Sequence, residues 1–168
     1  MNIIEVNANL LDYPLDGFGH SANCFHTFGA GIAASIKAKY PEAYEADVKF
    51  DRRGDIGKLG KFSFAKTYDE KYIYNLYGQY SMGGWKRQTN YEAIANALTG
   101  VKEHAFNNLV KRLGFPRNMG CALGGGDWRV VNALIQSVFE GDDNFEIYIC
   151  NYNPPIYQAI KDSMVNPQ

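Results

Sequence analysis

Short segments with a β-type hydrophobic pattern alternate along this chain with longer segments whose hydrophobic residues recur at helical spacing. The short segments predict strands at residues 2–6, 17–22, 62–67, 71–77, 115–120 and 145–150. The longer segments predict helices between residues 29 and 40, from 41 onward, from 89 to 113, from 128 to beyond 138, and after 153–155. Because helices alternate with strands through most of the chain, we expect an α/β fold with a largely parallel central sheet covered on both faces.

Local signals predict several boundaries of these helices. The first helix is expected to end near Tyr40, because Pro41 disfavours the α conformation in the residue before it and suits the first turn of a new helix. Residues 89–92 (TNYE) fit a capping box, and Gly114 is expected to end the long helix that follows. The charged, glycine-containing residues 50–61 predict a loop.

Composition favours one ordinary domain spanning residues 1–168. Hydrophobic residues make up 46% of the chain and charged residues 21%, and the net charge of −1 offers no direct evidence for nucleic-acid binding. We find neither a signal peptide nor a run that could span a membrane. The 3 cysteines are odd in number and lack metal-ligand spacing. We therefore expect a cytoplasmic monomer without a metal or a cofactor.

Two glycine-rich loops form the candidate ligand site. Residues 29–33 (GAGIA) and 120–126 (GCALGGG) each connect a predicted strand to a predicted helix. The free N–H groups and the dipole of a helix N-terminus favour phosphate, so two converging loops suit a diphosphate. Neither loop carries the Gly-Lys-Ser/Thr of a P-loop or a G-x-G-x-x-G motif, which disfavours an ATPase and an ordinary dinucleotide dehydrogenase.

Two side chains near these loops have both a structural and a chemical interpretation. His20 is either a core histidine or a ligand-facing acid, base or nucleophile at a strand end. Asp127 is either the N-cap of the helix that begins at Trp128 or a general base beside the phosphate loop. Cys24 and Cys121 are interpreted as packing residues, because the sequence places no activating base beside them.

Four motifs together resemble the macro domain family: HSANC at 20–24, GAGIA at 29–33, NLYGQ at 75–79 and GCALGGGDW at 120–128. The resemblance covers residues 2–150. It is closest to the stand-alone branch that includes the yeast-type ADP-ribose 1''-phosphate phosphatase and many phage and bacterial proteins. It implies a three-layer α/β/α fold with a mixed, largely parallel sheet, and ADP-ribose or an ADP-ribosyl derivative as the ligand.

The resemblance also implies roles for individual residues. The loop at 29–33 would hold the diphosphate and the distal ribose, and the loop at 120–126 would close over the other side. Three matches give the catalytic candidates: His20 in the phosphatase motif, Asn23 beside the distal ribose, and Asp127 in a loop that carries a catalytic acid in some branches. The residues expected to bind the ligand are Asn9, Leu10, Ser21, Gly29, Ala30, Gly31, Ile32, Ala33, Gln79, Gly120, Ala122, Leu123, Gly124, Gly125 and Gly126.

Two positions depart from the family pattern. Asn9 stands where macro domains usually carry an aspartate that accepts a hydrogen bond from the adenine amino group, so the charge of that acceptor is lost. Gln79 aligns with the lysine of the branch that removes ADP-ribose from glutamate, and the aspartate of that branch aligns nearer Gly124 than Asp127. Trp85 and Tyr152 are both candidates to stack on the adenine.

The sequence therefore leads to three functional hypotheses, of which the first is favoured. The first is a phosphatase that converts ADP-ribose 1''-phosphate to ADP-ribose and phosphate. The second is a hydrolase that removes ADP-ribose from protein or nucleic acid. The third is a non-catalytic protein that reads or sequesters ADP-ribose.

Overall fold

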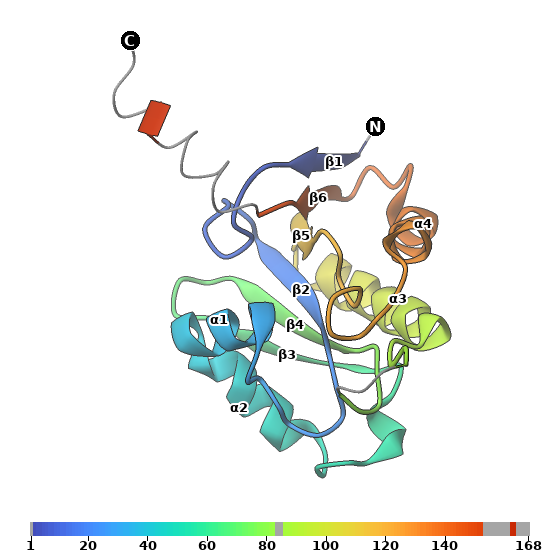
Figure 1. Ribbon diagram of the computed structural model, residues 1–168. Coiled ribbons are helices and arrows are strands. Elements are labelled where there is room, and N and C mark those ends of the chain that lie inside the picture. Colours follow the sequence, from blue (N-terminus) through green and yellow to red (C-terminus); the bar gives the residue numbers. More distant parts are fainter. Residues whose placement is uncertain (1, 83–85, 153–161, 164–168) are drawn as a thin grey trace.

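The computed structural model describes residues 2–82, 86–152 and 162–163, which form a mixed sheet between two layers of helices (Figure 1). The strands are β1 (Ile3–Val6), β2 (Gly17–Ala22), β3 (Phe62–Lys66), β4 (Tyr72–Tyr77), β5 (Arg112–Pro116) and β6 (Glu146–Cys150). They lie in the order β1-β6-β5-β2-β4-β3, and only β3 runs antiparallel to its neighbour. The expected α/β fold with a mixed, largely parallel sheet is confirmed.

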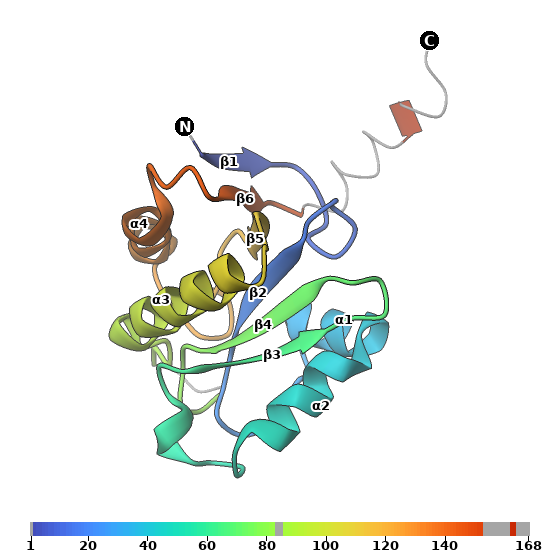
Figure 2. The same ribbon diagram turned by 180° about the vertical axis from the view of Figure 1, so that it is seen from behind.

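Helices cover both faces of this sheet (Figures 1 and 2). The helices are α1 (Gly31–Lys39), α2 (Pro41–Phe50), α3 (Tyr91–Asn107) and α4 (Trp128–Phe139), with a short 3-10 helix, η1, at Ile56–Lys58. One core packs α3 and α4 on the sheet through Leu98, Val101, Val131 and Ile135. Burying such a side chain contributes about 1.5–3 kcal/mol, so the periodic hydrophobic faces hold both helices in place. None of the described helices is long and apolar enough to pass through a membrane.

The predicted boundary between the long helix and the next strand is wrong. The helix ends at Asn107, and Leu109 is 88% exposed with a φ of +60°. The strand β5 then begins at Arg112, before the predicted residues 115–120, and residues 117–120 form a turn instead. Gly114, predicted to end the helix, lies inside β5, where an added Cβ would come within 2.5 Å of Leu15 Cδ1. Close packing against another segment therefore explains this glycine.

Two further local predictions need correction. Asn90 rather than Thr89 caps α3, since its side chain accepts a hydrogen bond from the N–H of Ala93 at 3.0 Å. Within residues 50–61, predicted as a loop, the chain forms η1, and the side chain of Lys58 is fully buried. The helix expected after residues 153–155 falls in a part of the chain where only residues 162 and 163 are described, and these two are helical.

The parallel strands bring their carboxyl ends to one edge of the sheet. Along this edge the loops that follow β1 and β6 are neighbours, the loop that follows β5 comes next, and the loops that follow β2 and β4 lie beyond it. Ligands of open α/β sheets bind in such a crevice. The strand order therefore decides which residues can contact the two ends of a bound molecule.

Candidate ligand-binding site

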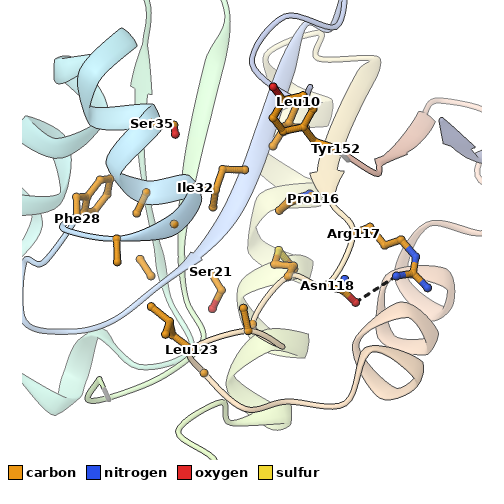
Figure 3. A pocket seen from close by; sticks show the side chains of 18 of the residues that line it. Leu10, Ser21, Phe28, Ile32, Ser35, Pro116, Arg117, Asn118, Leu123 and Tyr152 are labelled. Carbon is orange, nitrogen blue, oxygen red and sulfur yellow. Dashed lines mark hydrogen bonds between the residues drawn. The ribbon is translucent and has the colours of Figure 1, made fainter. Parts of the chain in front are cut away.

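A cavity of about 760 Å³ opens at the carboxyl edge of the sheet (Figure 3). This volume lies within the range of about 300–1,000 Å³ that small-molecule sites usually have. Its walls come from the N-terminus of α1 and from the loops after β1, β2, β4, β5 and β6. Elements far apart in the sequence thus contribute to a single cavity.

Most of the predicted site residues line this cavity. They are Asn9, Leu10, Ser21, Asn23, Gly29, Ala30, Gly31, Ile32, Ala33, Gln79, Gly120, Ala122, Leu123 and Gly124. Gly125 and Gly126, which complete the second glycine loop, are not among the lining residues, and neither are His20 and Asp127. The structure thus brings together the predicted binding residues and one catalytic candidate, Asn23.

The N-terminus of α1 faces the cavity without a cap. Ala30 occupies the N-cap position with no side-chain hydrogen bond, and the first turn carries no acidic residue. The glycine at the start of the helix, Gly31, has a φ of +58°, a conformation that side chains other than glycine rarely adopt. The first N–H groups of the helix are therefore available to a ligand, and the helix dipole adds partial positive charge there.

The second glycine loop is fixed against the start of α3. The hydroxyl of Thr89 donates to the carbonyl of Gly120 at 2.6 Å, and the N–H of Thr89 donates to the carbonyl of Gly124 at 3.0 Å. A Cβ at Gly124 would lie 2.5 Å from Thr89 Oγ1 and 2.8 Å from Gln79 Oε1. Only glycine therefore allows this loop to come so close to its neighbours at the cavity wall.

Polar side chains gather at the end of the cavity near β2 and β4. Asn23 is oriented by its own loop, because Nδ2 donates to Thr27 Oγ1 at 2.6 Å and Oδ1 accepts from the N–H of Phe25 at 2.9 Å. Gln79 donates from Nε2 to the carbonyl of Ser81 at 2.8 Å. Ser21 Oγ is buried and has no hydrogen-bond partner among the described residues. This end of the cavity is therefore polar, and it includes one hydroxyl without a hydrogen-bond partner in the described part of the chain.

The structure places His20 in the core rather than at the cavity. Its side chain is 0% exposed, and its Nε2 lies 2.7 Å from Asn75 Oδ1. Asn75 Nδ2 donates to Ala43 O and Ser63 Oγ, which fixes the amide oxygen toward His20 and makes Nε2 the donor. The structure therefore agrees with the interpretation of His20 as a core histidine. Burial lowers the pKa of His20 and favours the neutral ring.

A buried neutral histidine makes the stability of the protein depend on pH. The folded-state pKa of His20 lies below the ordinary value of 6.5, so below that pH the unfolded chain takes up a proton that the folded chain excludes. We expect the free energy of unfolding to fall as the pH drops from 7 to 5, and to fall less in His20→Gln. Urea unfolding at several pH values measures this, with His26→Gln, which replaces a half-buried histidine outside the core, as the control. An unchanged pH slope in His20→Gln would contradict it.

Asp127 acts as the N-cap of α4 in the structure. Its carboxylate accepts from the N–H of Arg129 at 2.9 Å and pairs with the guanidinium of the same residue at 2.8 Å. These contacts hold the pKa of Asp127 below its usual range. The carboxylate therefore stays ionised at the start of the helix, away from the cavity.

The remaining candidates divide between the core, the cavity and the undescribed residues. Cys24 is buried, and burial raises the pKa of its thiol to about 11, which agrees with a packing role. Tyr152 lines the cavity at the end formed by β1 and β6, whereas Trp85 lies outside the described residues. No group of three or more metal-ligating side chains occurs in the described part of the chain.

Sequence reasoning missed several residues that the fold brings to the cavity. They include Thr27, Phe28, Ser35, Met82, Arg117, Asn118 and Asn151. Asn151 could have been found, because it directly follows the last predicted strand at the binding edge. Arg117 is the one charged residue among the described lining residues, and none of those residues is Asp, Glu, His or Lys.

Comparison with known proteins agrees with this geometry. The chain is 30% identical over 138 residues to an uncharacterised 17.5 kDa protein of Enterobacteria phage T4, covering 80% of this chain and 85% of that protein. It is 30% identical over 142 residues to the ADP-ribose glycohydrolase OARD1 of Homo sapiens, covering 84% and 86%. It is 25% identical over 151 residues to the DNA ADP-ribosyl glycohydrolase of Thermus aquaticus, covering 89% of this chain but 40% of that protein.

Solved structures share the fold at lower sequence identity. A Bacteroides thetaiotaomicron protein of unknown function has a TM-score of 0.80 at 18% identity, covering 90% of this chain and 98% of that chain. The macrodomain of Thermus aquaticus DarG has a TM-score of 0.71 at 23% identity, with the same coverage of 90% and 98%. Thermosipho africanus DarTG in complex with ADP-ribose has a TM-score of 0.72 at 20% identity, covering 92% and 44%. A family model described as "Macro domain" matches residues 20–135, and this chain therefore belongs to the macro domain family.

Proposed function

We propose that the cavity binds ADP-ribose, with the diphosphate between the N-terminus of α1 and the loop at residues 120–124. The observation that carries this proposal is the uncapped first turn of α1, which lines a cavity large enough for a nucleotide. Several relatives carry ADP-ribose in their names, and the DarTG structure contains it. The apolar end near Leu10 suits a base, and the polar end near Ser21 suits a ribose.

We further propose that the protein hydrolyses the bond between the distal ribose and a macromolecular acceptor. The support is the similarity to two proteins named as glycohydrolases, one of them 30% identical over 84% of this chain. The polar end of the cavity provides the means to hold the reacting ribose, through Ser21, Asn23 and Gln79. Backbone N–H groups that hold the diphosphate also fix its position relative to these side chains.

The lack of an acid at the cavity narrows the class of acceptor. No Asp, Glu, His or Lys lines it in the described part of the chain, so no such group can protonate a departing acceptor there. A carboxylate needs no protonation at neutral pH, because carboxylic acids have pKa values near 4. Water adds to the anomeric carbon of the distal ribose, the bond between that carbon and the carboxyl oxygen breaks, the carboxylate is released, and the excess proton passes to solvent. We therefore propose esters of aspartate or glutamate as the preferred substrates, cleaved without the lysine whose position Gln79 occupies.

A comparison of three substrates tests this proposal. Purified protein at low concentration is incubated with a protein ADP-ribosylated on glutamate, with ADP-ribosylated DNA, and with ADP-ribose 1''-phosphate. Free ADP-ribose is measured by chromatography, and ADP-ribose binding is measured by calorimetry. We expect multiple turnovers of the glutamate ester at a rate well above that of the DNA substrate. Tight binding without turnover would leave a reader of ADP-ribose, and the absence of binding would overturn the proposal.

Hydrolysis of ADP-ribose 1''-phosphate, favoured from the sequence, has less support because neither His20 nor Asp127 lines the cavity. An Asp127→Ala variant distinguishes the role of Asp127 as a helix cap from its role as a catalytic residue. We expect it to lower the midpoint of thermal unfolding through loss of the α4 cap, with ADP-ribose binding and ester hydrolysis unchanged. Phosphate release by the original protein that disappears in Asp127→Ala would restore the catalytic role of Asp127 and favour the phosphatase.

A further inference from the structure

The cavity has two chemically different ends on either side of the N-terminus of α1. At the end formed by β1 and β6, Leu10 and Cys150 give an apolar surface, being 2% and 3% exposed, and the ring of Tyr152 lies at this end (Figure 3). The opposite end carries Ser21 and the polar groups near it. If the proposed function is correct, the flat apolar end receives the nucleobase, because a purine ring needs apolar and aromatic surface.

Asn9 is the polar side chain at this end whose orientation is fixed by the backbone. Its Oδ1 accepts a hydrogen bond from the N–H of Leu11 at 3.0 Å. Its own carbonyl accepts from the N–H groups of Asp12 and Tyr13, both at 3.0 Å, so the residue is held within a turn. Rotating the amide by 180° would direct an NH₂ group at the N–H of Leu11, which is unfavourable because both are donors.

The amide nitrogen of Asn9 is therefore the group left for a ligand. Nδ2 has no hydrogen-bond partner among the described residues, while Asn9 lines the cavity and is half-buried. Both N–H bonds of this amide group can donate a hydrogen bond, and its nitrogen does not accept one. The base end of the cavity thus presents a fixed hydrogen-bond donor.

A fixed donor discriminates between purines at position 6 of the ring. Adenine carries an amino group there, which is itself a donor, whereas hypoxanthine and guanine carry a carbonyl oxygen, which accepts. The N7 acceptor is common to all these bases and cannot discriminate between them. N1 accepts in adenine but carries a hydrogen in the 6-oxopurines, so a donor that faced N1 would favour adenine instead. We propose that Asn9 Nδ2 faces position 6 of the bound base, and that Asn9 is thereby a specificity-determining residue that makes the cavity accept 6-oxopurine diphosphate riboses at least as tightly as ADP-ribose. This proposal rests on the proposed binding of ADP-ribose.

Calorimetric titration with two ligands tests the proposal. The probes are ADP-ribose and inosine diphosphate ribose, which differ at position 6 and in protonation at N1 of the base. We expect the original protein to bind the inosine compound at least as tightly. In Asn9→Asp the carboxylate still accepts from the N–H of Leu11 and now also offers an acceptor to the cavity. We expect the ratio of the two affinities to shift by about tenfold or more toward ADP-ribose.

Asn118→Asp is the matched control, because it places the same charge on another residue that lines the cavity. The added charge is expected to weaken the binding of both ligands in both variants. Only Asn9→Asp should change the ratio of the two affinities. Tighter binding of ADP-ribose than of the inosine compound by the original protein would overturn the proposal, as would an unchanged ratio in Asn9→Asp. Failure of both ligands to bind the original protein would overturn the proposed function itself.

Discussion

An Ile32→Glu variant is expected to lose about 100-fold or more of its affinity for ADP-ribose while it keeps its fold. Ile32 is the second residue of α1 and lines the cavity at the proposed diphosphate position (Figure 3). Two unit charges about 5 Å apart interact by about 3 kcal/mol at an effective dielectric constant of about 20. That repulsion corresponds to a loss of about 100-fold in affinity.

The same substitution should keep the helix folded, because the loss of the partly buried Ile32 side chain from the core is shared by the Glu and Gln variants. The first turn of α1 has no acidic residue, and a carboxylate there interacts favourably with the helix dipole. Calorimetry against ADP-ribose and thermal unfolding together separate the two effects, and Ile32→Gln is the uncharged control. Raising the salt concentration should recover part of the affinity of Ile32→Glu. Equal affinity in the Glu and Gln variants would show that the diphosphate does not lie at this helix terminus.

The binding loops could be predicted from the sequence because their geometry is local. A glycine turn that enters a helix presents free N–H groups wherever it occurs, and parallel strands bring such turns to one edge of the sheet. The loops around Gly31 and Gly124 therefore line the cavity as expected. The structure also needs glycine at these positions, through a positive φ at Gly31 and close contacts at Gly124.

The direction of single side chains could not be predicted in the same way. His20 and Ser21 are adjacent in β2, so their side chains point to opposite faces of the sheet. Ser21 lines the cavity while His20 packs under α2, and the sequence does not show which face a helix will cover. A motif that contains both residues thus predicts the site but not which of the two reaches the ligand.

Helical spacing misled the prediction where the chain leaves α3. Leu109 and Leu113 continue the apolar period of the helix, but Asn108 ends it by donating from Nδ2 to the carbonyl of His104 at 2.8 Å. Leu113 is buried within β5 instead. A hydrophobic residue fits the core equally well from a helix or a strand, so periodicity alone could not place this boundary.

The burial of Lys58 is a third feature that could not be predicted from the sequence. Its replacement is the substitution from which we expect the largest loss of stability. Lys58 Nζ lies 3.1 Å from Asp47 Oδ1, and both side chains are 0% exposed. Tyr77 donates its hydroxyl to the same carboxylate oxygen at 2.6 Å, and Lys58 Nζ lies 4.5 Å from the centre of the Tyr77 ring. Nothing in a charged loop sequence indicates such a partner, because Asp47 lies on α2 and the contact depends on how the loop folds back.

We expect Lys58→Met to lower the free energy of unfolding by about 3–5 kcal/mol, because it leaves the carboxylate of Asp47 buried without its cation. Urea unfolding measures the loss, and Lys61→Met is the matched control on an exposed lysine, expected to change stability by less than about 0.5 kcal/mol. The double variant Asp47→Leu with Lys58→Met should recover part of the loss, since replacing a whole buried ion pair by apolar residues is often nearly neutral. Equal stability of Lys58→Met and Lys61→Met would mean that Lys58 is solvated in solution.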